Sequence, residues 1–159
     1  MRYEPASQTK PTATACQPGT RALQTALRDV FPELAIGTGP YGCFNPRRIA
    51  SSTAWSLHAE GRALDAGVVP ESFARAWSIA CHLVDRRTLY GVMRVMWDEH
   101  IWSCEQPASW RKLQPNTNQH RDHMHIEQYR ANAARPFAAV YNTMRAGLLD
   151  FRETLDPAP

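Results

Sequence analysis

Several common signals are missing from this chain of 159 residues. No stretch approaches the run of about 20 apolar residues that a membrane-spanning helix needs. The N-terminal residues 1–15 also lack the apolar core of a secretory signal peptide. We therefore expect a protein that has no transmembrane segment and is made in the cytoplasm without an export signal.

Dense basic runs are missing as well. The chain has 18 Lys and Arg against 15 Asp and Glu, a formal net charge of +3, and its basic residues are scattered apart from short pairs such as Arg47–Arg48 and Arg86–Arg87. Nucleic-acid-binding domains usually concentrate Lys and Arg on one face. We expect no nucleic-acid partner, while the mild positive charge favours approach to an anionic polymer.

The four cysteines lack the CxxC spacing that is typical of a structural zinc site. They are Cys16, Cys43, Cys81 and Cys104. Their even number would allow two disulfides, but the missing export signal points to a reducing compartment, where thiols stay free. We expect four free thiols.

The residues that are present are sufficient for one domain with one core. Hydrophobic residues make up 43% of the chain, too many for a disordered protein, and the length fits a single domain. Residues 1–18 are rich in Pro, Thr, Ala and Ser. We expect a flexible N-terminal segment there and a folded domain over residues 19–155.

Hydrophobic patterning predicts a few helices and several short strands. Apolar residues at helical spacing predict helices over residues 20–31, 70–87 and 129–155, the last with a break near Pro136. Strands are predicted over residues 61–69, 90–97, 101–103 and 123–126. Residues 104–118 contain two prolines and many polar residues, which predicts a loop.

Two stretches carry the chemistry, SLHAEGRALD over residues 56–65 and HRDHMHIE over residues 120–127. The first holds His58 and Asp65 seven positions apart, and the second places three of the six histidines within six residues. Zinc binds imidazole nitrogen and carboxylate oxygen, and a catalytic zinc needs three protein ligands plus an open position. His58, Asp65 and one histidine of the second stretch would supply that set. Asp65 stands among apolar residues, so it could instead cap a loop through backbone hydrogen bonds.

Asp122 is the candidate general base of this cluster. It stands three positions before His125, and a carboxylate beside zinc can accept a proton from water whose pKa the metal has lowered. In a regular strand, residues three apart face opposite sides. The assignment therefore needs an irregular start to the strand; otherwise His120 or His123 is the better candidate.

Together the two stretches resemble the motifs SxHxxGxAxD and DHxH of the LAS metallopeptidases, which include D-Ala-D-Ala carboxypeptidases and lysostaphin-type enzymes. The matching residues are Ser56, His58, Gly61, Ala63, Asp65, Asp122, His123 and His125. The order of predicted helices and strands extends the resemblance to roughly residues 20–130. It implies an α+β fold of the hedgehog or D-Ala-D-Ala peptidase type, in which a small antiparallel sheet flanked by helices carries the zinc site.

The resemblance also implies a role for each residue of the site. One Zn²⁺ would be bound by His58, Asp65 and His125. Asp122 would be the general base, although many relatives have Glu at that position, and His123 would stabilise the oxyanion or the substrate. An arginine upstream of the first motif would polarise the scissile carbonyl, with Arg48 as the first choice and Arg47 as the second. His120 is an alternative to His123 or His125.

The closest branch is similar to the D-Ala-D-Ala carboxypeptidases and L-alanyl-D-glutamate endopeptidases of phage endolysins, including those of phages that infect actinobacteria. It implies hydrolysis of a peptide bond in peptidoglycan stem peptides by a monomer that is made in the host cytoplasm and acts on the cell wall. One alternative is a zinc-containing binding module of the same fold without catalysis, and the presence of Asp122 argues against it. Another is an enzyme that acts on nucleic-acid phosphate, and the low net charge argues against that.

Overall fold

Six strands form one antiparallel sheet in the order β1-β2-β6-β3-β4-β5. The computed structural model describes residues 2–37, 41–50 and 52–156. The strands are β1 (Ala35–Ile36), β2 (Ala63–Gly67), β3 (Val92–Trp97), β4 (His100–Ser103), β5 (Gln106–Lys112) and β6 (His123–Gln128). The last strand along the chain, β6, lies between β2 and β3, so the two stretches that carry the chemistry are neighbours in the sheet.

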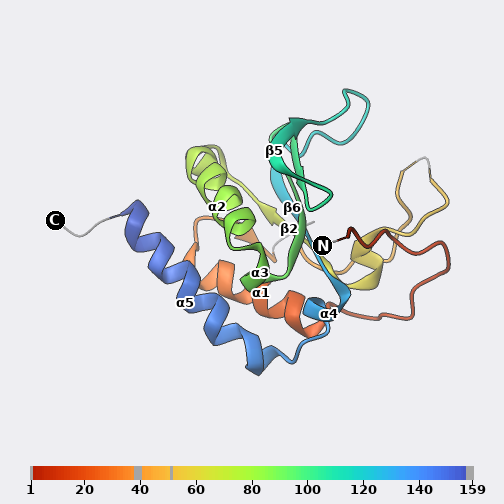
Figure 1. Ribbon diagram of the computed structural model, residues 1–159, viewed down its shortest axis with the longest axis horizontal. Helices are drawn as coiled ribbons and strands as arrows, with labels where there is room; N and C mark the ends of the chain where they lie inside the picture. The colour runs from red at the N-terminus through yellow and green to blue at the C-terminus, as the bar shows by residue number, and fades with distance from the viewer. Residues whose placement is uncertain (1, 38–40, 51, 157–159) are drawn as a thin grey trace.

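Helices pack beside this sheet, which confirms the predicted α+β class (Figure 1). The α-helices are α1 (Pro18–Val30), α2 (Phe73–Asp85), α3 (Arg87–Tyr90), α4 (Arg130–Ala133) and α5 (Phe137–Leu155), and the 3-10 helices are η1 (Leu57–Glu60) and η2 (Pro70–Ser72). Figure 1 shows α1 and α5 side by side, with the β4–β5 hairpin extending away from them. None of the helices in the described part of the chain combines the length and apolar character needed to cross a membrane.

The core lies between the sheet and the helices. Leu23 and Leu27 of α1 are fully buried, and so are Leu64 of β2 and Ile126 of β6. Burial of each such side chain stabilises the fold by roughly 1.5–3 kcal/mol. On α5, Val140, Met144 and Leu148 form the buried stripe that the sequence predicts.

Most predicted helices are present, with small differences at their ends. The first and last are confirmed, and the C-terminal pair α4 and α5 is interrupted at Pro136. The helix predicted over residues 70–87 begins with the 3-10 turn η2 and ends at Asp85. Tyr90, predicted to start a strand, ends α3 instead, because Gly91 takes a left-handed conformation with φ of 67° that stops the helix.

The predicted loop over residues 104–118 is wrong in its first half, where β5 lies. This strand sits at the edge of the sheet with mostly exposed side chains, so it has no buried face that would produce alternating hydrophobicity. Pro107 is tolerated there because an edge strand leaves one row of backbone groups without a partner strand. The two-residue strand β1 was also missed, since two residues are too few for a pattern.

The segment predicted to be a flexible lead-in contains no helix or strand over residues 2–17, but it makes specific contacts with the rest of the fold. The backbone N–H of Trp55 donates to the Ser7 carbonyl at 2.9 Å, and the N–H of Gln17 donates to the Gly61 carbonyl at 2.8 Å. The described part of the segment therefore lies along the domain and is held by backbone hydrogen bonds.

A disulfide joins Cys16 to Cys43, with 5.4 Å between their Cα atoms. The prediction of four free thiols is therefore wrong, and only Cys81 and Cys104 are free. The two bonded cysteines are 27 positions apart, so no local motif connects them. They meet because the N-terminal segment passes the loop that leads to η1. Part of that turn-rich loop, residues 38–40, lies outside the described residues.

Candidate metal site

The motif SxHxxGxAxD is a structural unit that places one histidine and one aspartate on the same site. Ser56 caps η1, because its side-chain oxygen accepts a hydrogen bond from the His58 N–H at 3.3 Å. Gly61 then ends η1 in a left-handed conformation with φ of 70°. A Cβ at this position would lie 2.3 Å from the Ala15 carbonyl oxygen, so only glycine fits. The chain then enters β2, which carries Asp65.

The second motif supplies its histidine from the neighbouring strand. In the antiparallel pair of β2 and β6, Asp65 lies directly opposite His125. Opposite residues in adjacent strands point to the same face of a sheet, so the register brings these two side chains together. His58 reaches the same place from η1, which immediately precedes β2.

Three donor atoms converge in this arrangement. His125 Nδ1 lies 2.8 Å from Asp65 Oδ1, and His58 Nε2 lies 3.2 Å from both of these atoms. Both histidines are buried, with exposed fractions of 1% for His58 and 8% for His125. Within the described residues these three side chains form a candidate metal triad, with one ligand atom from each and all ligand atoms within 4.8 Å of one another. The predicted ligand set is thus assembled in space.

The donor set is chemically suited to a cation. Burial raises the pKa of Asp65, but hydrogen bonds from His125 and His58 outweigh it and hold that pKa well below its ordinary value. Burial lowers the pKa of His58, which favours the neutral imidazole that binds metals. His58 Nε2, His125 Nδ1 and Asp65 Oδ1 all face one another in this arrangement. A cation between them would satisfy all three donors.

Glu127 lies directly behind the triad. Its Oε1 is 3.2 Å from His125 Nε2, and its exposed fraction is 5%. Burial lowers the pKa of His125, but hydrogen bonds to Asp65 and Glu127 outweigh it and raise the pKa to about 9. A ligating histidine commonly donates its second ring N–H to a carboxylate, which fixes the ring and its tautomer. The sequence analysis missed Glu127, although its position two residues after His125 in a strand was a usable signal.

Asp122 lies in the bend before β6, outside the regular strand. Its Oδ1 is 2.7 Å from His123 Nδ1, and its Oδ2 accepts a hydrogen bond from the Tyr41 hydroxyl at 3.3 Å. The other ring nitrogen of His123, Nε2, is 3.7 Å from Asp65 Oδ1. His123 therefore stands between the Asp122 carboxylate and the triad. Tyr41 is a second residue that the sequence analysis missed, and no pattern around it signals its role.

His120 borders the same cluster. Its ring centroid is 4.9 Å from that of His123 and 5.5 Å from that of His125. The residue takes a left-handed conformation with φ of 49°, which is unfavourable for a side chain larger than glycine. Burial, together with the neighbouring histidines, lowers its pKa to about 4. A neutral imidazole thus lines the site next to His123.

The two candidate arginines differ in their surroundings. The Arg48 guanidinium lies 4.8 Å from the Trp55 ring centroid and donates to the Thr53 carbonyl, so its contacts are within its own loop. The positive charge of Arg47 contributes to the low pKa of His58, after the larger effect of burial.

Comparisons with known proteins identify a family. No curated protein and no solved structure matches the chain. A family model described as "VldE, C-terminal domain" matches residues 12–124, well over half of the chain. The matched region includes His58, Asp65 and Asp122 and stops just before His125. The chain therefore belongs to the VldE C-terminal domain family.

Proposed function

We propose that this protein is a zinc-dependent peptidase that hydrolyses a peptide bond in peptidoglycan stem peptides. The observation that carries the proposal is the convergence of His58, Asp65 and His125 from η1, β2 and β6. Two imidazoles and one carboxylate are a donor set of catalytic zinc, which keeps a further position open. The likeness of both motifs to those of the LAS peptidases supports the reaction and the substrate class. We also propose that the chain shares the fold of the D-Ala-D-Ala peptidases.

The side chains around the triad have the chemistry that peptide hydrolysis requires. Zinc held by the triad would polarise the scissile carbonyl and make water a better nucleophile at neutral pH. In the proposal, Asp122 accepts the proton of the attacking water and passes it to the leaving amine. His123 and Tyr41 hold the two carboxylate oxygens of Asp122, which fixes its orientation.

Two further groups complete the proposed machinery. His123 presents Nε2 to the triad, where it would stabilise the oxyanion or the substrate. In the proposal, one arginine of the loop before η1, Arg48 or Arg47, polarises the substrate carbonyl.

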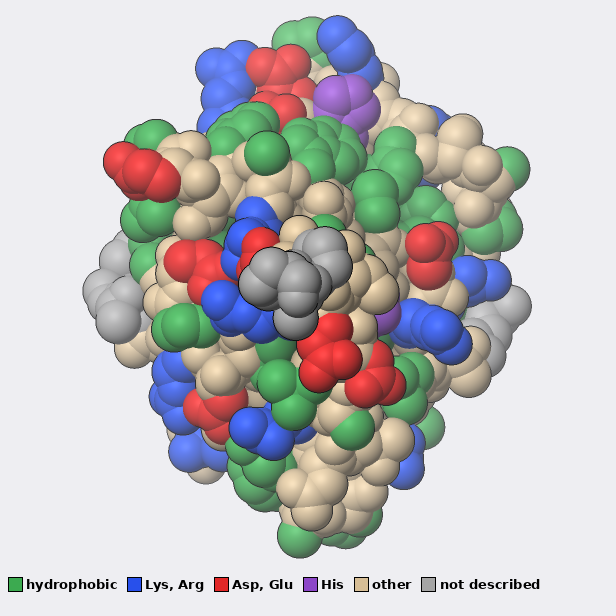
Figure 2. Space-filling view, turned by 90° about the vertical axis from the view of Figure 1, so that its left-hand side faces the viewer, with side chains coloured by type: hydrophobic (Ala, Val, Ile, Leu, Met, Phe, Trp, Pro, Cys, Tyr) green, Lys and Arg blue, Asp and Glu red, His purple; other side chains and the backbone are tan. Residues whose placement is uncertain are grey.

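The proposed setting of this activity is the cell wall. A disulfide is characteristic of proteins that work in an oxidising environment, which is consistent with action on the cell wall after synthesis in the cytoplasm. Figure 2 shows acidic and basic side chains interspersed on the face that it presents. A mixed surface of this kind suits a monomer without a nucleic-acid partner.

Metal analysis is the first test. Purified protein should contain close to one equivalent of zinc per chain, and His58→Ala and Asp65→Ala should each lose most of it because each removes one of three ligands. His100→Ala is the matched control, since His100 lies on β4, outside the triad. If both triad variants keep the full zinc content, the ligand assignment is wrong.

Digestion of defined peptidoglycan tests the reaction itself. Mass spectrometry of the released fragments should show a cleaved peptide bond in the stem peptide, and treatment with a chelator should abolish the release. Plasmid DNA incubated in parallel should stay intact. Zinc binding without any cleavage of peptidoglycan would support the binding module instead and would refute the peptidase.

A further inference from the structure

A chain of polar contacts leads from the candidate metal triad to the N-terminal segment. His125 Nε2 is 3.2 Å from Glu127 Oε1, and Glu127 Oε2 is 3.6 Å from Arg94 NH1. The same NH1 donates a hydrogen bond to the Tyr3 hydroxyl at 2.9 Å. Two side chains, Glu127 and Arg94, thus connect the candidate ligand His125 to Tyr3.

In the middle of this chain of contacts, Glu127 is buried and Arg94 is half-buried. Arg94 of β3 lies directly opposite Glu127 of β6 in the sheet, so the ion pair is set by strand register. The Arg94 guanidinium lies 3.9 Å from the centroid of the Tyr3 ring, close enough for a cation–π interaction. The Glu127 carboxylate thus lies between His125 on one side and Arg94 on the other.

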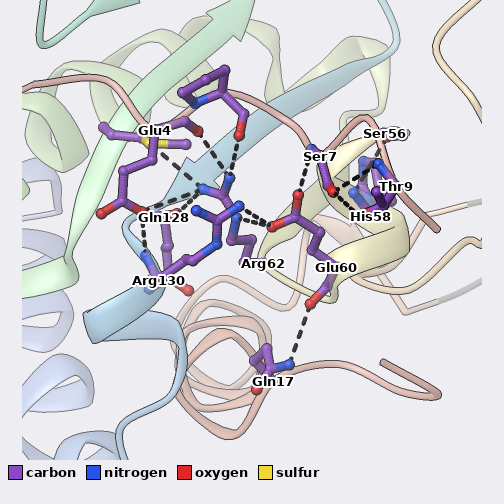
Figure 3. Close-up of polar contacts among 12 residues, drawn as sticks. Glu4, Ser7, Thr9, Gln17, Ser56, His58, Glu60, Arg62, Gln128 and Arg130 are labelled. Atoms are coloured by element: carbon purple, nitrogen blue, oxygen red, sulfur yellow. Dashed lines mark hydrogen bonds and ion pairs between the residues drawn. The ribbon is translucent and has the colours of Figure 1, made fainter. Parts of the chain in front are cut away.

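Tyr3 belongs to an N-terminal strap, residues 3–7, whose backbone is fastened to the domain (Figure 3). The fastening residue is Arg62, at the start of β2, with an exposed fraction of only 1%. Its NH2 donates to the carbonyls of Glu4 at 2.8 Å and Pro5 at 3.2 Å. Figure 3 shows the Arg62 side chain between Glu4 and Glu60. These bonds fix the backbone next to Tyr3 and so fix where its ring lies.

The orientation of the His125 ring is what this network controls. A proton on Nε2, donated to Glu127, leaves the lone pair of Nδ1 free, and Nδ1 is the atom that faces Asp65 and His58. The other tautomer would place a proton at the metal position. Arg94 pairs with Glu127 and holds it in place, and the Tyr3 ring stacks on the Arg94 guanidinium.

We propose that the N-terminal strap is a positioning element for the metal ligand His125, acting through Arg94 and Glu127. The inference rests on the proposed function, because it needs a metal at the triad. Residues 3–7 are then part of the site's supporting structure. Tyr3, Arg94 and Glu127 are positioning residues that have no direct contact with the metal.

Zinc affinity, measured by competition with a chromophoric chelator, tests the proposal without recourse to catalysis. Glu127→Gln should weaken binding by roughly 10–100-fold, the usual effect of removing an outer partner of a ligating histidine. Tyr3→Ala should weaken it in the same direction by a smaller factor. Tyr3→Phe keeps the ring over Arg94, so its zinc affinity should lie between that of Tyr3→Ala and that of the wild type. Cobalt substitution should show an altered visible spectrum in Glu127→Gln, because the ligand field changes when His125 is reoriented.

Tyr141→Phe is the matched control, because the Tyr141 hydroxyl donates to Asp29 in the α1–α5 region and takes no part in the network. Its zinc affinity should equal that of the wild type. If wild type binds one zinc and both Glu127→Gln and Tyr3→Ala bind it equally tightly, the strap inference fails while the metal site stands. If wild type binds no zinc, the proposed function fails first. Thermal unfolding of the metal-free variants distinguishes unfolding from a loss of affinity in a folded chain.

Discussion

At the scale of single residues, the site depends on where Asp122 lies. A regular strand would turn its side chain away from His125, but β6 begins only at His123 and leaves Asp122 in a bend. The carboxylate is held by His123 on one side and Tyr41 on the other. Asp122 thus lies in an irregular start of the strand, but His123 stands between its carboxylate and the triad, and the general-base role stays a proposal.

Asp122→Asn should separate metal binding from chemistry. The amide keeps the size of the carboxylate but cannot accept a proton at neutral pH, so turnover on peptidoglycan should fall by roughly 10²–10⁴. Zinc content should stay near that of the wild type, because all three triad residues remain. Asp29→Asn is a suitable control, since Asp29 also accepts a tyrosine hydroxyl but lies on α1. Wild-type turnover in Asp122→Asn, or zinc lost together with activity, would contradict the assignment.

The triad was predictable because two local motifs contain all of its members. His58 and Asp65 share one turn-and-strand unit, and His125 lies within a cluster of histidines. Tyr41 was not predicted, because its hydrogen bond to Asp122 depends on how a distant loop folds back on the site. The position of Glu127 could be predicted only from the strand register, which places it beside Arg94. A sequence pattern therefore identifies ligands more readily than the residues that support them.

At the scale of elements, the turn between η1 and β2 holds the N-terminal strap in place. Glu60 ends η1 and pairs with Arg62 at 2.7 Å, with Arg130 at 3.0 Å and with the Ser7 N–H at 2.9 Å. Burial raises the pKa of Glu60, but these partners outweigh it, and the pKa in the folded state is lowered. The carboxylate therefore stabilises the fold only while it is ionised.

Glu60→Gln should lower stability in a pH-dependent way. Because the folded-state pKa lies below the unfolded value, the contribution is fully present above about pH 4.3 and is lost as the pH falls through the folded value. At neutral pH the loss should be up to about 3–5 kcal/mol, the cost of breaking a buried ion pair. Urea unfolding at pH 7 and at pH 3 should show that the difference between the variant and the wild type shrinks on acidification. A difference that grows at low pH would contradict the ionised role of Glu60.

The elements that the sequence failed to predict share one physical property. Strand β5 is an exposed edge strand, and β1 has only two residues, so neither shows a periodic pattern of hydrophobic residues in the sequence. By contrast α1, β2 and α5 each bury a continuous apolar face and were predicted from it. Prediction from pattern succeeds where an element contributes to the core and fails where backbone pairing alone defines it.

At the scale of the whole molecule, the Cys16–Cys43 disulfide ties the segment before α1 to the loop that leads to η1. It could not be predicted from the sequence, because it follows from tertiary proximity and from the redox compartment in which the protein works. Thiol titration of the denatured, non-reduced protein should count two free thiols, those of Cys81 and Cys104. A count of four without reductant would show that the bond does not form.

Loss of the disulfide should destabilise the protein. A closed loop with a separation of 27 residues contributes about 3.5 kcal/mol by the chain-entropy argument, so Cys16→Ser should lower the free energy of unfolding by that order. Cys81→Ser, which removes an exposed free thiol, is the control and should have little effect. Equal stability of both variants would mean that the bridge contributes nothing to the fold.

The central place of β6 has a consequence for the order of assembly. Strands β1 and β2 form one part of the sheet and β3, β4 and β5 form another, and β6 alone joins them. The same strand carries His125, so a growing chain on the ribosome has neither a continuous sheet nor a third metal ligand until residues 123–128 have emerged. Completion of the sheet and completion of the candidate metal triad are thus a single event. If the proposed function holds, a nascent chain is inactive until residues 123–128 have been synthesised.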